Sequence, residues 1–319
     1  MRPRLGHKPA PAAGGDGGTT LARAFFPVSA AVAMRLHHLN CISSCPIGGH
    51  LMDGRAGCLF CRGSLCCHCI LAETPRDGLV LVDTGFGLRD VRDPRSRLSA
   101  FFLALLKPDF KESMTAVRQI EALGYKASDV RHIALTHLDF DHAGGLDDFP
   151  NATVHLMRRE RESAALQATW MDRQRYRPQQ WSSLRRWKTY LPGDGDAWFG
   201  FRGVRLLEGV HADIAMVPLH GHTHGHAGVA LLDDPKWLLQ AGDAYFYHGE
   251  LNLERPHCTP GLRFYQWMME KERRARLENQ ARLRKLKHER AAEVDICCSH
   301  DPQEFDALVA RAESAHAMV

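Results

Sequence analysis

Four side chains that can bind a metal ion stand within six residues of one another. An apolar run at residues 133–135 comes before them, and Ala143-Gly144-Gly145 comes after. This pattern predicts a buried strand that ends in a tight loop and then a short helix. A loop at a strand end can aim ligands spaced at i, i+2, i+4 and i+5 at one point, whereas a helix cannot. The four side chains are His137, Asp139, Asp141 and His142.

The mixture of imidazole and carboxylate groups in this segment decides which metals suit it. Such a set favours zinc, manganese or iron over calcium or magnesium. The alternative is a polar loop in which Asp141 caps the following helix. The clusters of His among the chain's 19 favour metal chemistry over that alternative.

Four more strand-like runs end in residues of the same chemical kinds. Residues 79–82 lead into Asp83-Thr84-Gly85, and residues 214–217 lead into a turn that contains His222, His224 and His226. Two later runs end in Gly242-Asp243 and in Ser299-His300. Each of these endings, taken alone, is also compatible with an ordinary polar turn.

Taken in order, these segments resemble the metallo-β-lactamase superfamily. The signature His-x-His-x-Asp-His is matched at residues 137–142, except that Asp139 stands where the second His is expected. The resemblance covers roughly residues 34–319. It implies an α/β fold, the four-layer αββα sandwich of that superfamily, with the site at the edge where the two sheets meet.

The resemblance also implies a ligand set for two divalent metal ions, zinc in the first place and manganese or iron as alternatives. One ion is expected to bind His137, Asp139, His222 and Asp243. The other is expected to bind Asp141, His142, Asp243 and His300, with a bridging water or hydroxide. By the same resemblance, Asp83 and His226 support these ligands without binding metal themselves.

Asp139 is the one departure from the signature. A carboxylate oxygen lies two bonds from Cβ, as does the Nδ1 atom of the expected His, so we expect Asp139 to bind metal. Two divalent ions, one hydroxide and three carboxylates then sum to zero charge. This count predicts a less electrophilic centre that favours a neutral ester, lactone or amide, and harder ions such as manganese or iron.

Three residues are candidates for a direct part in the reaction. Asp141 is one, beside its expected role as a ligand. The others are Tyr245 and Tyr247, which closely follow Asp243 and whose hydroxyl groups could donate to a tetrahedral intermediate. Ordinary packing is the alternative for both tyrosines.

The segments between the ligand runs alternate between helical and strand-like patterns, which predicts an α/β layered fold. Helices are expected at residues 98–106, 113–123, 261–290 and from about 303 to 314. Strands are expected at residues 69–73, 79–82, 130–135, 152–157, 214–217, 229–232, 237–241 and 294–298.

Composition indicates which partners and which cellular compartment to expect for the protein. The net charge of +4 over 319 residues predicts neither a nucleic-acid nor a membrane partner. Residues 1–33 are rich in Gly, Pro and Ala and are expected to be a disordered extension. The ten Cys are not spaced like a secreted disulfide framework, so reduced thiols and a cytoplasmic location are expected. Cys58-Leu-Phe-Cys61 has zinc-like spacing, which leaves a structural zinc site as an alternative.

Residues 158–200 mix Arg with aromatic side chains and are expected to form one or two helices and then a loop. In the superfamily, an insert at this place often covers the metal cleft. A cap over the site is therefore expected here. A solvated face and a nucleic-acid surface are the alternatives.

The residues and the resemblance together predict a dinuclear metal-dependent hydrolase, in which a metal-bound hydroxide attacks the carbonyl of an ester or lactone. The alternatives are a β-lactam, thioester or phosphodiester hydrolase of the same fold, and a non-catalytic ligand-binding member. The expected partner is a small-molecule substrate, and a homodimer is left open.

Overall fold

The computed structural model describes residues 34–316 except 56, 185, 192, 194 and 234. The expected N-terminal extension, residues 1–33, lies outside the described residues. These described residues belong to one compact unit. The architecture below refers to the described part of that unit.

Two six-stranded sheets form the centre of the fold. The first has the order β1 (Arg35–Asn40), β2 (His68–Thr74), β3 (Gly78–Val82), β4 (Val130–Ala134), β5 (Thr153–Met157), β6 (Trp187–Tyr190). The second has the order β12 (Val294–Cys297), β11 (Lys236–Gln240), β10 (Ala227–Asp233), β9 (Ile214–Pro218), β8 (Phe201–Leu206), β7 (Asp196–Trp198).

Strand direction differs within each sheet. The pairs β3–β4, β4–β5 and β5–β6 are parallel, whereas the pairs β1–β2 and β2–β3 are antiparallel. In the second sheet only β11 and β12 are parallel, and the pairs from β7 to β11 are antiparallel. The carboxyl ends of parallel neighbours lie at the same edge of a sheet. The loops after β3 and β4 are therefore neighbours, as are the loops after β11 and β12.

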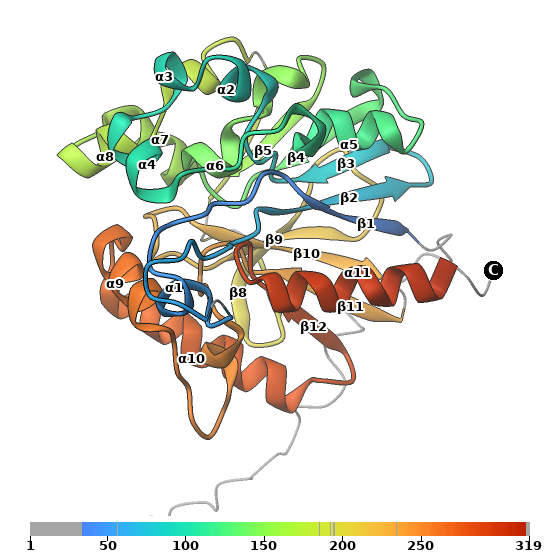
Figure 1. Ribbon diagram of the computed structural model, residues 1–319. Coiled ribbons are helices and arrows are strands. Elements are labelled where there is room, and N and C mark those ends of the chain that lie inside the picture. Colours follow the sequence, from blue (N-terminus) through green and yellow to red (C-terminus); the bar gives the residue numbers. More distant parts are fainter. Residues whose placement is uncertain are drawn as a thin grey trace, which may run out of the picture. The chain divides into compact units, whose positions relative to one another are not determined.

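Helices cover the outer faces of both sheets. Figure 1 shows α2 to α8 beyond the first sheet, and α9 and α10 beyond the second. The helices are α1 (His50–Asp53), α2 (Leu88–Arg92), α3 (Pro94–Arg97), α4 (Ala100–Leu106), α5 (Ala116–Ala122), α6 (Phe140–Ala143), α7 (Arg158–Leu166), α8 (Trp170–Arg175), α9 (Pro260–Met269), α10 (Arg273–Glu289) and α11 (Pro302–His316). Short 3-10 turns are η1 (Glu112–Met114), η2 (Ala127–Asp129), η3 (Leu146–Asp148), η4 (Pro178–Gln180) and η5 (His248–Leu251).

Each face of the first sheet packs into a different core. In β3, Val80 and Val82 face the second sheet, where they pack with residues such as Met216 and Val229. The alternate residues Leu79 and Leu81 face outward into the core beneath the helices. A strand buried on both faces must be apolar throughout, which explains the continuous run at residues 79–82. The α/β sandwich expected from the sequence is confirmed.

Two expectations about secondary structure are wrong. Residues 261–290 form two helices, because the backbone N–H groups of Lys271 and Glu272 donate to the carbonyl of Gly221, at 2.8 and 2.9 Å, instead of continuing a helix. After α7 and α8, the segment expected to end as a loop contributes the edge strands β6 and β7. In β6 the buried Tyr190 is held by a 2.6 Å hydrogen bond between its hydroxyl and Nδ1 of His155.

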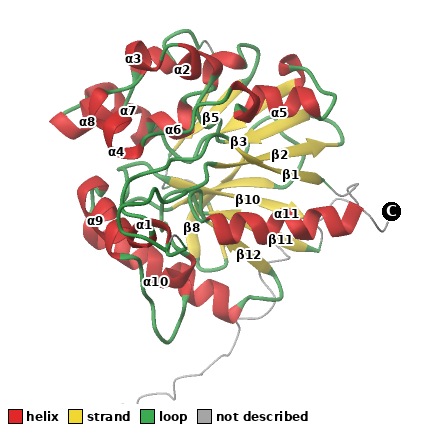
Figure 2. Cartoon of the chain, viewed as in Figure 1, coloured by secondary structure: helices red, strands yellow, loops and turns green. Residues whose placement is uncertain are grey.

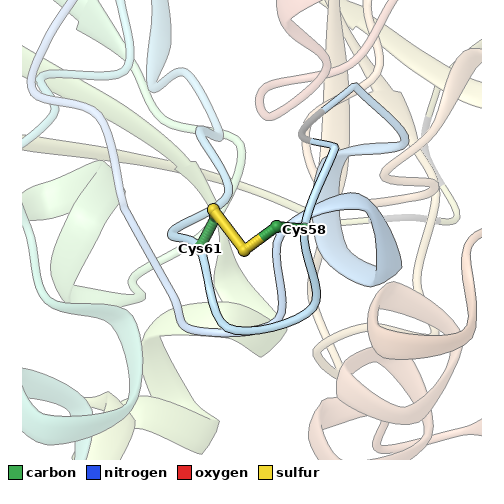
Figure 3. The surroundings of a disulfide bond; sticks show 2 residues. All are labelled: Cys58 and Cys61. Atoms are coloured by element: carbon green, nitrogen blue, oxygen red, sulfur yellow. A yellow bond between two sulfur atoms is a disulfide. The ribbon is translucent and has the colours of Figure 1, made fainter.

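The expectation of reduced cysteines holds for all but one pair. Eight cysteines are free: Cys41, Cys45, Cys66, Cys67, Cys69, Cys258, Cys297 and Cys298. Cys58 and Cys61 are joined by a disulfide (Figure 3), with Cα atoms 5.2 Å apart. This separation lies within the range that a disulfide needs. The expectation of reduced thiols was wrong for this pair, and the pair does not offer the thiolates that a zinc site would need.

Candidate metal centre

The ligand candidates come from loops at one edge of the two sheets. Figure 2 shows these loops gathered at the left-hand ends of the strands. Residues 137–142 follow β4, and Asp83 follows β3, its parallel neighbour. Asp243 and His300 follow β11 and β12, and His222 lies in the turn between β9 and β10. Parallel pairing within each sheet, and the stacking of the sheets, bring the loops together.

The first cluster of side chains has ligand atoms that all lie within 4.8 Å of one another. Oδ2 of Asp139 lies 3.3 Å from Nε2 of His137 and 3.0 Å from Nε2 of His222. Oδ2 of Asp243 lies 3.3 Å from Nε2 of His222 and 3.7 Å from Nε2 of His137. All four residues are buried, and they are His137, Asp139, His222 and Asp243.

The second cluster consists of Asp141, His142 and His300, with the same 4.8 Å limit between ligand atoms. Here the other oxygen of Asp243 takes part. Its Oδ1 lies 3.3 Å from Nε2 of His142 and 3.2 Å from Nε2 of His300. Asp243 thus turns one carboxylate oxygen to each cluster, which is the geometry expected of a ligand shared by two metal ions.

The ring nitrogens of the second cluster require a cation between them. Nδ1 of His142 lies 2.8 Å from Oδ2 of Asp83, and Nδ1 of His300 lies 2.8 Å from the carbonyl oxygen of Cys66. Both partners are acceptors, so each Nδ1 carries the hydrogen and each neutral ring offers a lone pair at Nε2. The two Nε2 atoms face each other at 3.3 Å. A metal ion, or a proton in its absence, is needed to relieve this contact.

The charges of the site are strongly coupled. Although burial opposes it, Asp243 and Asp83 raise the pKa of His142 well above its usual value, and Asp243 also raises the pKa of His300. Burial and the nearby His142 lower the pKa of His137 to about 4. Its Nε2 is buried without a hydrogen-bond partner. A neutral imidazole with a free inward lone pair is a competent metal ligand, so these residues fit the expected ions.

Asp83 supports the centre as expected. Its carboxylate accepts hydrogen bonds from the backbone N–H and the hydroxyl of Thr136, both at 2.8 Å, in addition to its contact with His142. Asp83 has a φ of +55°, in the left-handed region that few residues other than glycine adopt. This strained conformation turns the carboxylate back toward the ligand loop. Backbone strain of this kind is common at functional sites.

Two more groups hold the ligand loops. Nε2 of His226 accepts a hydrogen bond from the backbone N–H of Asp243 at 2.9 Å, in line with its expected supporting role. The buried carboxylate of Glu160, in α7, accepts from the N–H of Leu138 at 3.1 Å and from the hydroxyl of Thr223 at 2.6 Å. Glu160 therefore joins the loop after β4 to the turn between β9 and β10. Sequence reasoning missed it, because one Glu in a charged helix carries no local signal.

Arg175 was also missed, although it contacts the residue that departs from the signature. Its guanidinium, at the end of α8, is fully buried and binds both carboxylate oxygens of Asp139. Although burial alone would raise it, Arg175 and His137 hold the pKa of Asp139 well below its usual value. The charge count made from the sequence omitted this cation.

The two tyrosines proposed from the sequence make their contacts with residues outside the two clusters. The hydroxyl of Tyr245 donates to Oε2 of Glu304 at 2.7 Å, and the ring of Tyr247 lies 4.2 Å from that of His248 between centroids. The intervening Phe246 stacks on His300, with the ring centroids 5.3 Å apart. These contacts give neither tyrosine support for the expected oxyanion role, which stays a prediction for both.

Tyr265, in α9, is a better-placed phenol. Its ring lies 5.6 Å from that of Phe246, which is in contact with His300. Burial and the charges of Asp141, Asp139 and Asp243 raise the pKa of Tyr265 well above its ordinary value. The hydroxyl is thus close enough to the site to be influenced by its carboxylates. The sequence gave no sign of this, because α9 lies far from the ligand segments along the chain.

Comparison with known proteins places this geometry in context. The family model described as the metallo-beta-lactamase superfamily matches residues 65–285. The chain is 39% identical over 269 residues to a probable metallo-hydrolase of Mycobacterium tuberculosis, covering 84% of this chain and 81% of that protein. It is also 35% identical over 96 residues to an N-acyl homoserine lactonase of Bacillus cereus, covering 30% of this chain and 38% of that one.

Solved structures with a similar fold include an N-acyl homoserine lactone hydrolase with N-hexanoyl-L-homoserine bound at its catalytic metal centre. The TM-score is 0.64 at 21% identity, covering 86% of this chain and 97% of that one. A dizinc quorum-quenching lactonase, AidC, gives 0.57 at 15% identity, covering 85% and 89%. At these identities the likeness shows the fold alone.

Proposed function

Because the chain belongs to the metallo-beta-lactamase superfamily, we propose that it is a dinuclear metal-dependent hydrolase that cleaves an ester, and in particular a cyclic ester. A metallo-hydrolase is the function that its relatives and its site have in common. The dinuclear state, the ester substrate and the roles of individual residues are the further content of the proposal.

The observation that carries the proposal is the position of Asp243 between the two clusters. Its Oδ1 faces Nε2 of His142 and His300, at 3.3 and 3.2 Å, and its Oδ2 faces Nε2 of His222 at 3.3 Å. The N–H of Asp243 is held by His226, which fixes the carboxylate in this orientation. One carboxylate shared by two sets of inward-facing imidazoles is an arrangement that a purely structural cluster would not need.

When bound, two divalent ions would lower the pKa of a water molecule to near neutrality and polarise the oxygen of the bond to be cleaved. The residues of the chain supply the rest. Asp141 belongs to the second cluster, with Oδ2 3.7 Å from Nε2 of His300, and we assign to it the transfer of a proton to the leaving alcohol. Tyr265 replaces Tyr245 and Tyr247 as the candidate donor to the developing oxyanion.

A lactone is the first choice of substrate for two reasons. The proteins named N-acyl homoserine lactonase match part of this chain at 26–35% identity, and lactonases are among the similar folds. In addition, no separate substrate-binding domain is present among the described residues, which form one compact unit. β-Lactams, thioesters and phosphodiesters remain the alternative substrates, and residues 158–200 are proposed to cover the centre.

Zinc is the proposed ion, with manganese and iron as alternatives. The setting is proposed to be the cytoplasm, which the eight free cysteines support. No helix in the described ranges is long and apolar enough to cross a membrane. A homodimer is a further proposal, which light scattering of the purified protein tests.

The first experiment is to purify the protein without chelator and to measure its metals by elemental mass spectrometry. The expected result is about two transition-metal ions per chain. The loaded protein is then given N-hexanoyl-homoserine lactone, a β-lactam, a thioester and a phosphodiester, and acid release is followed by pH indicator. The proposal is supported if the lactone is the only substrate that is hydrolysed, or the one that is hydrolysed fastest. The variant Asp243→Asn serves as the inactive control.

Two outcomes would contradict the proposal. Faster hydrolysis of another substrate class would replace the lactone with that class. A protein that takes up neither zinc nor manganese would point instead to a non-catalytic ligand-binding member of the family.

A further inference from the structure

Arg175 is the most completely buried cation beside the proposed centre. Its side chain has no exposed surface. Its Nε donates to Oδ1 of Asp139 at 2.6 Å and one terminal nitrogen donates to Oδ2 at 2.5 Å. The other terminal nitrogen donates to the carbonyl of Met269 at 2.6 Å. This two-pronged contact is the strongest geometry that an arginine and a carboxylate can form.

The backbone fixes the pair as well as the side chains. Asp139 and Tyr176, the residue after Arg175, form an isolated antiparallel β-bridge. The end of α8 is therefore held against the ligand loop, while the contact with Met269 ties it to the end of α9. Arg175 does not reach this place by a flexible excursion, because three segments of the chain position it.

Burial makes the two charges dependent on each other. An unpaired guanidinium or carboxylate in the interior is costly, whereas a pair with good hydrogen bonds is tolerated. Asp139 has 2% of its surface exposed, so neither group can be satisfied by solvent. The buried aspartate at position 139 therefore requires a neutralising partner, which Arg175 supplies.

We propose that Asp139 and Arg175 act as one unit that replaces the neutral histidine of the family signature. Arg175 cancels the extra negative charge of Asp139. The sum of two divalent ions, one hydroxide, three carboxylates and one guanidinium is a net positive charge of one. This equals the sum for the usual set with two carboxylates, so the less electrophilic centre predicted from the sequence is corrected.

The pair also restricts how Asp139 can bind metal. Both oxygens of Asp139 accept from Arg175, but only Oδ2 also faces Nε2 of His137 and of His222, at 3.3 and 3.0 Å. Asp139 is then a ligand through Oδ2 alone, as imidazole is through a single nitrogen. This inference rests on the metal binding assumed in the proposed function, but it does not depend on which substrate is cleaved.

The test compares Arg175→Met, Asp139→His and the double variant by thermal unfolding and by metal content. With a chelator present, we expect Arg175→Met to lower the Tm by about 10 °C, because Asp139 is left buried and unpaired. Saturating zinc should make this loss smaller, since the ion also neutralises Asp139. In Asp139→His, repulsion between Arg175 and the ion should reduce the zinc content to about one ion per chain.

The double variant, Asp139→His with Arg175→Met, has a neutral histidine at position 139 and no guanidinium beside it. Its metal content should return to about two ions per chain, and its loss of Tm should be clearly smaller than the sum of the two single losses. Arg173→Met is the matched control, because Arg173 lies in the same helix, is exposed and donates to the carbonyl of Gln167. Its Tm and metal content should equal those of the parent.

Additive losses of Tm, or a single variant Asp139→His with full zinc content, would overturn the inference. If Arg175→Met yields no folded protein, the double variant decides. A folded double variant with two ions supports the pair, and an unfolded one refutes it. Failure of the proposed function is separate, because a protein that hydrolyses no ester can still show the coupling in Tm and metal content.

Discussion

Asp83 illustrates how a single residue outside the ligand set controls the proposed centre. Its carboxylate hydrogen-bonds with Nδ1 of His142 and with the backbone N–H of Thr136. To reach these partners, Asp83 adopts a strained backbone conformation with a φ of +55°. Carboxylates that orient a ligand histidine fix its tautomer and raise its basicity. Position 83 should therefore matter to metal affinity although it touches no metal.

We predict that Asp83→Asn weakens metal binding about 10- to 100-fold, which is the range typical of such supporting groups. Asn tolerates the left-handed conformation, so the backbone should be preserved. Competition with a chromophoric chelator measures the affinity. Asp93→Asn, at an exposed helix end, is the control, and equal affinities for the two variants would contradict the assigned role.

At the same scale, the phenol of Tyr265 should contribute to turnover. Tyr265→Phe is expected to lower kcat about 100-fold, because a donor to the developing oxyanion is lost. Tyr245→Phe is the matched control. It should leave kcat unchanged and lower stability by about 1–2 kcal/mol through the lost hydrogen bond to Glu304. A larger effect on kcat from Tyr245 than from Tyr265 would reverse the assignment.

At the scale of elements, three parallel strands of the first sheet share a buried polar chain. Nε2 of His155, in β5, lies 3.0 Å from Nδ1 of His132 in β4, and its Nδ1 lies 2.6 Å from the hydroxyl of Tyr190 in β6. Burial, together with His132 and Lys188, lowers the pKa of His155 from 6.5 to about 3. The strands are thus joined by a histidine that must stay neutral.

This depressed pKa predicts a loss of stability in acid. Above pH 6.5 His155 is neutral in both the folded and the unfolded state, so it has no pH-dependent effect. As the pH falls from 6.5 toward 3, only the unfolded state binds the proton, and the free energy of unfolding falls by about 1.4 kcal/mol per pH unit from this group. His155→Gln should show a correspondingly shallower decline.

Urea unfolding at several pH values, in the presence of chelator, measures this slope for both proteins. The chelator removes the contribution of metal binding, and the difference between the two slopes isolates His155. Parallel slopes for the parent and for His155→Gln would mean that His155 is protonated in the folded state.

For the whole molecule, the proposed centre joins its two sheets. His137, Asp139, Asp141 and His142 belong to the loop after β4 of the first sheet, whereas His222, Asp243 and His300 belong to loops of the second. Each cluster contains ligands from both sides. Bound ions would therefore crosslink the sheets, and would be expected to stabilise the folded state.

Removal of metal should lower the Tm by about 10 °C, since an ion at about 1,000 times its Kd contributes about 4 kcal/mol. Differential scanning calorimetry with and without a chelator measures this shift, and addition of zinc should reverse it. The variant His224→Ala, outside both clusters, should respond as the parent does. A Tm that does not respond to the chelator would mean that ions do not bridge the sheets.

The chemistry of the ligands and their order were determined by the sequence itself. His137, Asp139, Asp141 and His142 lie so close along the chain that one loop brings them together, and Asp83, His222, Asp243 and His300 each follow an apolar strand. Local spacing is sufficient there, because strand ends in such a fold meet at one edge. The alternation of elements predicted an α/β layered fold, and the resemblance to the superfamily implied the sandwich of two sheets.

Only the tertiary structure decided what surrounds the ligands. Arg175 lies 36 residues from Asp139, and Glu160 and Tyr265 lie in helices whose own patterns point to no site. The break between α9 and α10 depends on the carbonyl of Gly221, which is distant in sequence. The reason is physical: local patterns set which face of an element is buried, whereas a charge balance between distant residues depends on how the elements pack.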